Sequence, residues 1–116
     1  MKYMLLMYVA ESNVPSTTEA RQAIAPVVWQ TLMKDMEAAG VYRSSNGLSP
    51  VANATTARVR EGKTLITDGP FAETHEQLGG FFLLDCKDLD EAIRWAERIP
   101  HAKYGSIEVR PLWSET

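Results

Sequence analysis

The sequence of 116 residues matches the size of one domain, and 45% hydrophobic with 23% charged residues fits a globular protein that buries one core. A formal net charge of −3 without a basic patch argues against binding to nucleic-acid phosphates. Cys86 is the single cysteine, which excludes an intramolecular disulfide and a thiolate metal cluster, and we interpret it as a small buried residue in a strand.

The N-terminal segment is expected to be the first strand. Residues 3–9, YMLLMYV, form a short apolar run without helical spacing, and polar residues end it. The run is far shorter than the roughly 20 residues of a membrane span, and it has no small-residue cleavage site. Without a targeting segment or a disulfide, the cytoplasm is the expected compartment.

A helix is predicted after a polar loop. Residues 16–18 offer N-cap oxygens, and Pro26 either restarts a helix or kinks one. From Val27 to Ala39, apolar residues recur every three or four positions, which is typical of an amphipathic helix. Gly40 is placed to end this helix as a C-cap residue.

Strands are predicted in the middle of the chain. Residues 41–51 are expected to be an irregular extended segment around a Ser-Asn-Gly turn. Residues 55–60 and 64–67 have the pattern of two short strands joined by a tight turn, a β-hairpin. Residues 79–86, GGFFLLDC, are apolar on both faces, which predicts a central strand.

The last third is expected to form a helix and a strand. The helix covers residues 88–100, with Asp88 as its N-cap and Pro100 as its end. Its apolar face is predicted to consist of Ala92, Ile93, Trp95, Ala96 and Ile99. Residues 105–113 alternate between apolar and polar side chains, as a strand does.

Without the hairpin, the order of elements is β-α-β-β-α-β, which indicates a ferredoxin-like α+β fold in a single domain over residues 1–116. Two helices would cover one face of an antiparallel sheet. Residues 4–6 and 81–83 are nevertheless apolar on both faces of that sheet. We therefore expect a second copy of the chain to cover the open face in a homodimer.

The stretch KTLITDGPFAETHEQLGGFFLLDCKDLDEAIRWAERIP, with MKYMLLMY before it and GSIEVRPL after it, resembles the DGPF-motif family of the YCII-related superfamily. The resemblance implies a dimeric α+β barrel. It also implies a small bacterial protein, because members of the family are mostly small bacterial proteins of unassigned activity. Many are encoded beside extracytoplasmic-function sigma factors, which implies a regulatory context. Some members of the superfamily resemble lyases that eliminate a small acid from a cyclic substrate.

The family motif falls on Asp68, Gly69, Pro70 and Phe71. The YCII branch is thought to use a histidine on its first helix and an aspartate before the proline that follows its second helix. Here Trp29 lies near the histidine position and Ile99 precedes Pro100, so an activity based on that pair does not transfer.

The motif loop has a structural interpretation. Asp68 would accept from backbone N–H groups as an Asx turn, with Gly69 and Pro70 shaping the chain. Phe71 would fill the core or a dimer contact. Residues 79–80, Gly-Gly, would permit a close backbone approach where the next strand starts.

The same loop also has a functional interpretation. Asp68 and Glu73 are the candidate catalytic bases, since a pocket can tune a carboxylate for proton transfer. The candidate substrate-binding residues are Tyr8, Trp29, Phe71, His75 and Arg110. No cofactor and no metal site are expected, because neither His75 nor His101 has an i, i+4 partner, and His101 is expected in an exposed loop.

Three functions follow from these observations. The first is a protein that binds a small molecule beside the motif loop, in the regulatory context that the resemblance implies. The second is a cofactor-independent enzyme for proton transfer or elimination, with Asp68 or Glu73 as the base. The third is a homodimeric interaction module without a ligand.

Overall fold

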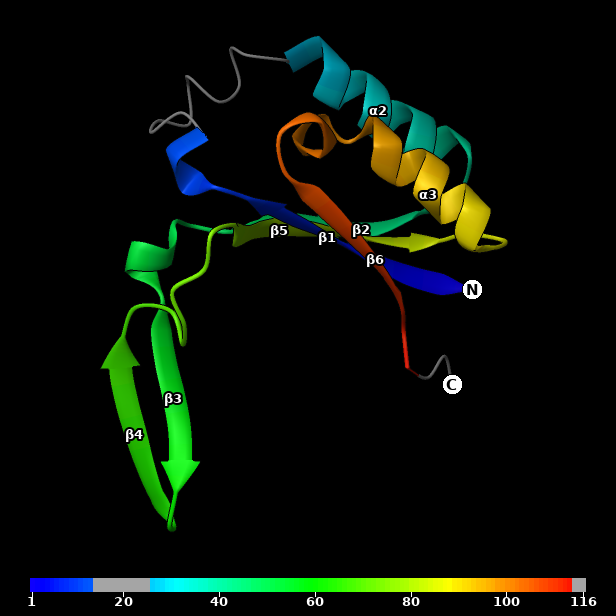
Figure 1. Ribbon diagram of the computed structural model, residues 1–116. Coiled ribbons are helices and arrows are strands. Elements are labelled where there is room, and N and C mark those ends of the chain that lie inside the picture. The colour runs from blue at the N-terminus through cyan, green and yellow to red at the C-terminus, as the bar shows by residue number, and fades with distance from the viewer. Residues whose placement is uncertain (14–25, 114–116) are drawn as a thin grey trace.

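The computed structural model describes residues 1–13 and 26–113, which form two α-helices, a four-stranded sheet and a separate two-stranded ribbon (Figure 1). In chain order the elements are β1 (Lys2–Val9), the 3-10 helix η1 (Glu11–Asn13), α2 (Pro26–Ala38), β2 (Tyr42–Gly47), η2 (Val51–Asn53), β3 (Thr55–Arg60), β4 (Lys63–Asp68), β5 (Gln77–Asp85), α3 (Leu89–Arg98), η3 (Pro100–Lys103) and β6 (Ser106–Pro111). The predicted caps at residues 16–18 lie outside the described residues. No helix within them is both long and apolar enough to span a bilayer.

The four strands of the sheet follow the order β2-β5-β1-β6, and each neighbouring pair is antiparallel. β5 is therefore a central strand, as predicted. This α+β architecture is compatible with a ferredoxin-like fold. The predicted turn in residues 45–47 is wrong, because Ser45, Asn46 and Gly47 pair with β5 as the end of β2. Gly47 fits this position because it lies opposite another glycine, Gly80.

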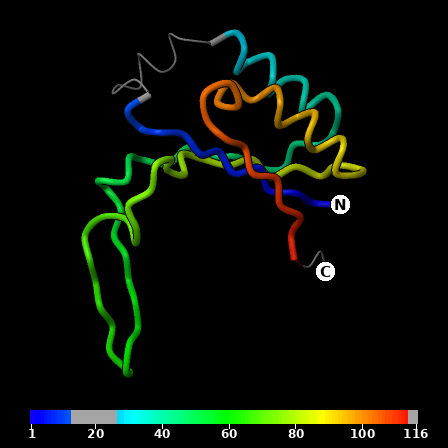
Figure 2. The backbone as a smooth tube through the Cα atoms, in the orientation of Figure 1, coloured from blue at the N-terminus to red at the C-terminus, as the bar shows by residue number. Residues whose placement is uncertain are grey.

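Helices α2 and α3 cover one face of the sheet, while no α-helix of the described residues lies on the other face (Figures 1 and 2). Burial alternates strictly along β1, so every second side chain from Tyr3 to Val9 lies under the helices. The largest fully buried side chains of the core are Leu5, Leu32, Met36, Leu84, Cys86 and Ile99. Ile93 was expected in this core but is exposed, because the buried stripe of α3 runs through Ala92 and Ala96.

The end of α2 and the start of α3 are formed by the residues that the sequence predicts. Gly40 has a φ of 73°, and its N–H donates to Glu37 O at 3.0 Å, while Val41 N donates to Met36 O at 3.1 Å. These two bonds form a Schellman motif at the end of α2. At the start of α3, Asp88 Oδ1 accepts from Glu91 N at 2.9 Å, which confirms the predicted N-cap.

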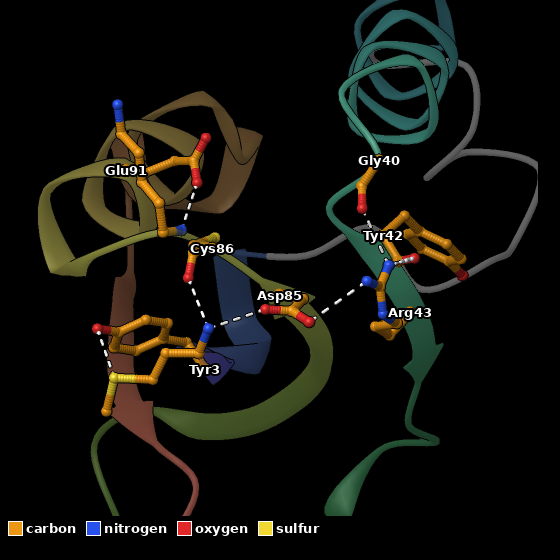
Figure 3. A network of polar contacts seen from close by, with 9 residues as sticks. Tyr3, Gly40, Tyr42, Arg43, Asp85, Cys86 and Glu91 are labelled. Carbon is orange, nitrogen blue, oxygen red and sulfur yellow. Dashed lines mark hydrogen bonds and ion pairs between the residues drawn. The ribbon is translucent and has the colours of Figure 1, made fainter. Parts of the chain in front are cut away.

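A carboxylate network joins three chain segments at one end of the sheet (Figure 3). Asp85 accepts from the Met1 amino group at 2.9 Å and from Arg43 Nη2 at 3.3 Å. The hydrogen bond from the Met1 amino group holds the pKa of the Asp85 carboxyl below its usual range. The stabilisation from this network is therefore present above the ordinary carboxyl pKa and is lost as the pH falls through the lowered one.

Cys86 is buried beneath α3, as expected for a small core residue, although it follows the last residue of β5. Burial, together with the nearby Glu91 and Asp85 carboxylates, raises the pKa of its thiol to about 11. A proton that the folded state holds more tightly than the unfolded state stabilises the fold below the unfolded pKa. This stabilisation is lost as the pH rises toward the folded pKa.

We therefore expect the free energy of unfolding to fall between pH 9 and pH 11, by at most about 1.4 kcal/mol per pH unit from this thiol. Urea unfolding at a series of pH values measures the slope. Cys86→Ala removes the thiol, so its slope should be smaller over the same range. Equal slopes in the parent and in Cys86→Ala would contradict the assignment.

The ribbon of β3 and β4 extends away from the rest of the molecule, on the side of the sheet opposite the helices (Figures 1 and 2). It is the predicted hairpin, and Glu61 and Gly62 form its turn with φ values of 52° and 75°, as a type I′ turn requires. The radius of gyration is 16.1 Å, compared with about 13 Å for a compact chain of this length. The difference indicates that the ribbon lacks the packing of an ordinary domain.

Candidate functional site

A pocket of about 800 Å³ lies where α2 and η3 meet the adjoining ends of β1, β2 and β5. Its apolar wall includes Met7, Val9, Trp29, Met33 and Phe82. Its polar wall includes Glu11, Ser45, Asn46, Ser49, Gln77 and His101. An open pocket of this size with an apolar wall and a polar wall has the general character of a small-molecule site.

A row of aromatic rings crosses the pocket from the sheet to η3. Trp29 stacks on Phe82 with ring centroids 6.4 Å apart and an interplanar angle of 16°. The His101 ring is tilted by 56° relative to the Trp29 ring, with centroids 5.6 Å apart, and the Tyr104 ring lies 5.4 Å from that of His101. A flat ligand would find a ready stacking surface along this row.

His101 is held in place by the chain around it. It follows Pro100, which ends α3 and begins η3, and its carbonyl oxygen accepts from Gly105 N at 2.7 Å. Gly105 lies so close to β1 that a Cβ atom there would overlap the Tyr8 carbonyl oxygen. A glycine at this position therefore lets η3 pack against β1 and brings the imidazole to the pocket.

A short hydrogen-bond chain fixes the polar rim. The Gln77 side chain accepts from Glu11 N at 2.9 Å and donates to Thr74 O at 2.6 Å. The Glu11 carboxylate accepts from Val51 N at 2.9 Å. These bonds tie η1, η2 and the end of the motif loop to one another, so the rim is held by residues of three separate segments.

The strand beside the pocket contains a β-bulge at Gly79. Met7 pairs with Gly80 and Tyr8 pairs with Leu78, which leaves Gly79 without a partner on β1. Gly79 O instead accepts from Leu48 N at 2.9 Å. The predicted close approach is confirmed at Gly80, where a Cβ atom would lie only 2.8 Å from Asn46 O.

Charge is scarce in the pocket. Among its described lining residues there is one carboxylate, that of Glu11, and there is no lysine or arginine. An anionic ligand would lose its hydration beside the Glu11 carboxylate without gaining a lysine or arginine partner from this lining, which is unfavourable. The described lining therefore suits an uncharged ligand.

The structure brings one of the predicted substrate-binding residues, Trp29, to this pocket. Tyr8 is half-buried near the end of β1, and Arg110 is exposed on β6, both outside the lining. His75 and Phe71 are exposed in the motif loop, with Phe71 exposed to 75%. Phe71 therefore does not fill the core of its own chain, and a dimer contact remains the alternative.

The motif loop is held by its backbone rather than by the predicted Asx turn. The Asp68 side chain makes no hydrogen bond within residues 1–13 and 26–113, although it stands next to Gly69 with a φ of 94°. Gly69 N donates to Ala54 O at 2.7 Å, and Thr56 Oγ1 donates to Gly69 O at 2.8 Å. The Glu73 side chain is exposed and lies outside the pocket lining, so catalysis by Asp68 or Glu73 stays a prediction.

His101 is the site residue that sequence reasoning missed, because a histidine after a proline was expected to be exposed. A signal was present, since His101 directly follows Pro100, the proline after the second helix. Trp29 lies near the position of the histidine in the YCII branch, and His101 lies two residues after the position of the aspartate. The rings of Trp29 and His101 are in contact.

A comparison with known proteins identifies the family to which this sequence is similar. The sequence model of the YCII-related domain matches residues 1–116. An uncharacterized protein of Rhizobium meliloti (strain 1021) is 45% identical over 92 residues, which cover 72% of this chain and 74% of that protein.

Proposed function

The chain belongs to the family of proteins with a YCII-related domain, and we propose that it binds an uncharged small molecule with a flat ring in the pocket between α2, η3 and the sheet. The observation that carries this proposal is the stacking surface of Trp29 and Phe82, which ends at His101. The aromatic wall would bind the ring, and the polar rim would orient a hydroxyl or carbonyl group.

A titration with two matched probes tests the proposal. The probes are 2-naphthol, which is uncharged near neutral pH, and 2-naphthoate, which has a carboxylate on the same ring system. We expect 2-naphthol to shift the amide signals of Gly79 and Ser49 and the indole signal of Trp29 in ¹H–¹⁵N spectra. It should bind at least about tenfold more tightly than 2-naphthoate, because the described lining offers the carboxylate no lysine or arginine partner.

Variants locate the site. Trp29→Leu removes the stacking surface and should weaken 2-naphthol binding about tenfold, whereas Trp113→Leu changes a fully exposed tryptophan and should have no effect. Glu73→Gln separates this pocket from the alternative site in the motif loop. Loss of binding in Glu73→Gln with full binding in Trp29→Leu would overturn the proposal.

A second proposal concerns assembly, namely that the protein is a homodimer whose copies meet through the helix-free face of the sheet. This face carries Met4 and Leu6 of β1 beside Phe81 and Leu83 of β5, all of them partly exposed to solvent in the single chain. A contiguous apolar surface at the centre of a sheet is the kind of surface that a second copy covers.

A further inference from the structure

The ribbon of residues 55–68, named the arm from here on, has two chemically different sides. Residues that pair directly across the ribbon share a side. Ala57 pairs with Ile66 and Val59 pairs with Thr64, so Ala57, Val59 and Ile66 share one side, called the apolar side, which also carries Thr64 and, at its base, the pair of Thr55 and Asp68. Val59 is exposed to 64% and Ile66 to 62%, which means that this side has no cover within the described chain.

The other side of the arm is basic and carries the motif loop. It presents Arg58, Arg60 and Lys63, because Arg58 pairs with Leu65 and Arg60 with Lys63. On this side, Arg58 Nη2 donates to Phe71 O at 3.0 Å and Thr56 Oγ1 donates to Gly69 O at 2.8 Å. The loop therefore contacts the arm on its basic side, while Val59 and Ile66 on the apolar side stay exposed.

A two-stranded ribbon with one uncovered apolar side is at best marginally stable in water. We infer that the apolar side of the arm docks on a second copy of this chain. The inference rests on the proposed homodimer through the open sheet face, and it adds a second contact surface to that assembly.

The direction and length of the arm support a second copy as the occupant. The arm extends on the same side as the open sheet face, where the second copy would lie (Figure 1). Six paired residues span roughly 20 Å, whereas two packed sheets are about 10 Å apart. The arm is therefore long enough to pass the partner's sheet, and two-fold symmetry gives each copy one arm and one docking surface.

Charge substitutions on the two sides of the arm test this inference. Ile66→Glu places a carboxylate on the apolar side, and Thr67→Glu places the same group on the other side, one residue away. We expect Ile66→Glu to raise the dimer dissociation constant at least tenfold and Thr67→Glu to change it less than twofold. Sedimentation velocity across a dilution series measures both, and circular dichroism checks that the fold is intact.

Photo-crosslinking provides an independent measurement. A cysteine in place of Ile66, or in place of Thr67 as the control, is labelled with benzophenone maleimide, while buried Cys86 stays unlabelled. Illumination should give a product of twice 12.9 kDa from position 66 and much less from position 67. If the parent is a monomer, the homodimer and the arm contact both fail. If the parent is a dimer but positions 66 and 67 behave alike in both assays, the arm inference alone is overturned.

Discussion

Leu83→Glu is expected to convert the protein from a dimer to a monomer. Leu83 lies on the central strand β5 and faces away from the helices, between Met4 of β1 and Ser44 of β2. Neither neighbour carries a charge, so a glutamate there would be buried without a partner when two sheets meet. Breaking an interface in this way costs about 3 kcal/mol or more, which weakens association at least about a hundredfold.

The matched control is Gln30→Glu, which adds the same group at an exposed position of α2 on the helical side. Sedimentation equilibrium of both variants and the parent gives the dissociation constants. The single-chain fold should survive in Leu83→Glu because this side chain is partly exposed there. A Leu83→Glu protein that remains as tight a dimer as Gln30→Glu would exclude this face as the interface.

The parts of the fold that the sequence predicts are those set by local patterns. Asp88 before an apolar run, Gly40 after one and Glu61-Gly62 between two strands each determine a cap or a turn within a few residues. The errors occur where partners distant in the sequence decide the outcome. Residues 45–47 have turn chemistry, yet pairing with β5 makes them a strand.

The candidate site was less predictable for the same reason. Trp29 could be recognised because a large aromatic residue on an apolar helix face points inward. The position of His101 depends on the approach of η3 to β1, some 90 residues earlier in the chain, through Gly105 and Tyr8. The motif loop is rich in acids, but it is bound to β3 through the Thr56 hydroxyl and Gly69 O, and Glu73 lies outside the pocket lining.

Gly105→Ala is expected to be strongly destabilising. The new methyl group would overlap the Tyr8 carbonyl oxygen and would also press on His101 O, 3.2 Å away. Both obstacles are backbone atoms, so no side-chain rotation can relieve the overlap. Either η3 or the start of β6 must move away from β1, and such forced backbone shifts cost about 3 kcal/mol.

Gly79→Ala is the matched control, because its new methyl group would lie 3.8 Å from the nearest atom, Val9 Cγ1. Its free energy of unfolding should stay within about 1 kcal/mol of the parent value. Urea unfolding measures both variants. Gly105→Ala should also displace His101, so its imidazole signals should shift and 2-naphthol binding should weaken, whereas the imidazole signals should stay unchanged in Gly79→Ala. Equal stability of the two variants would show that η3 does not depend on this close approach.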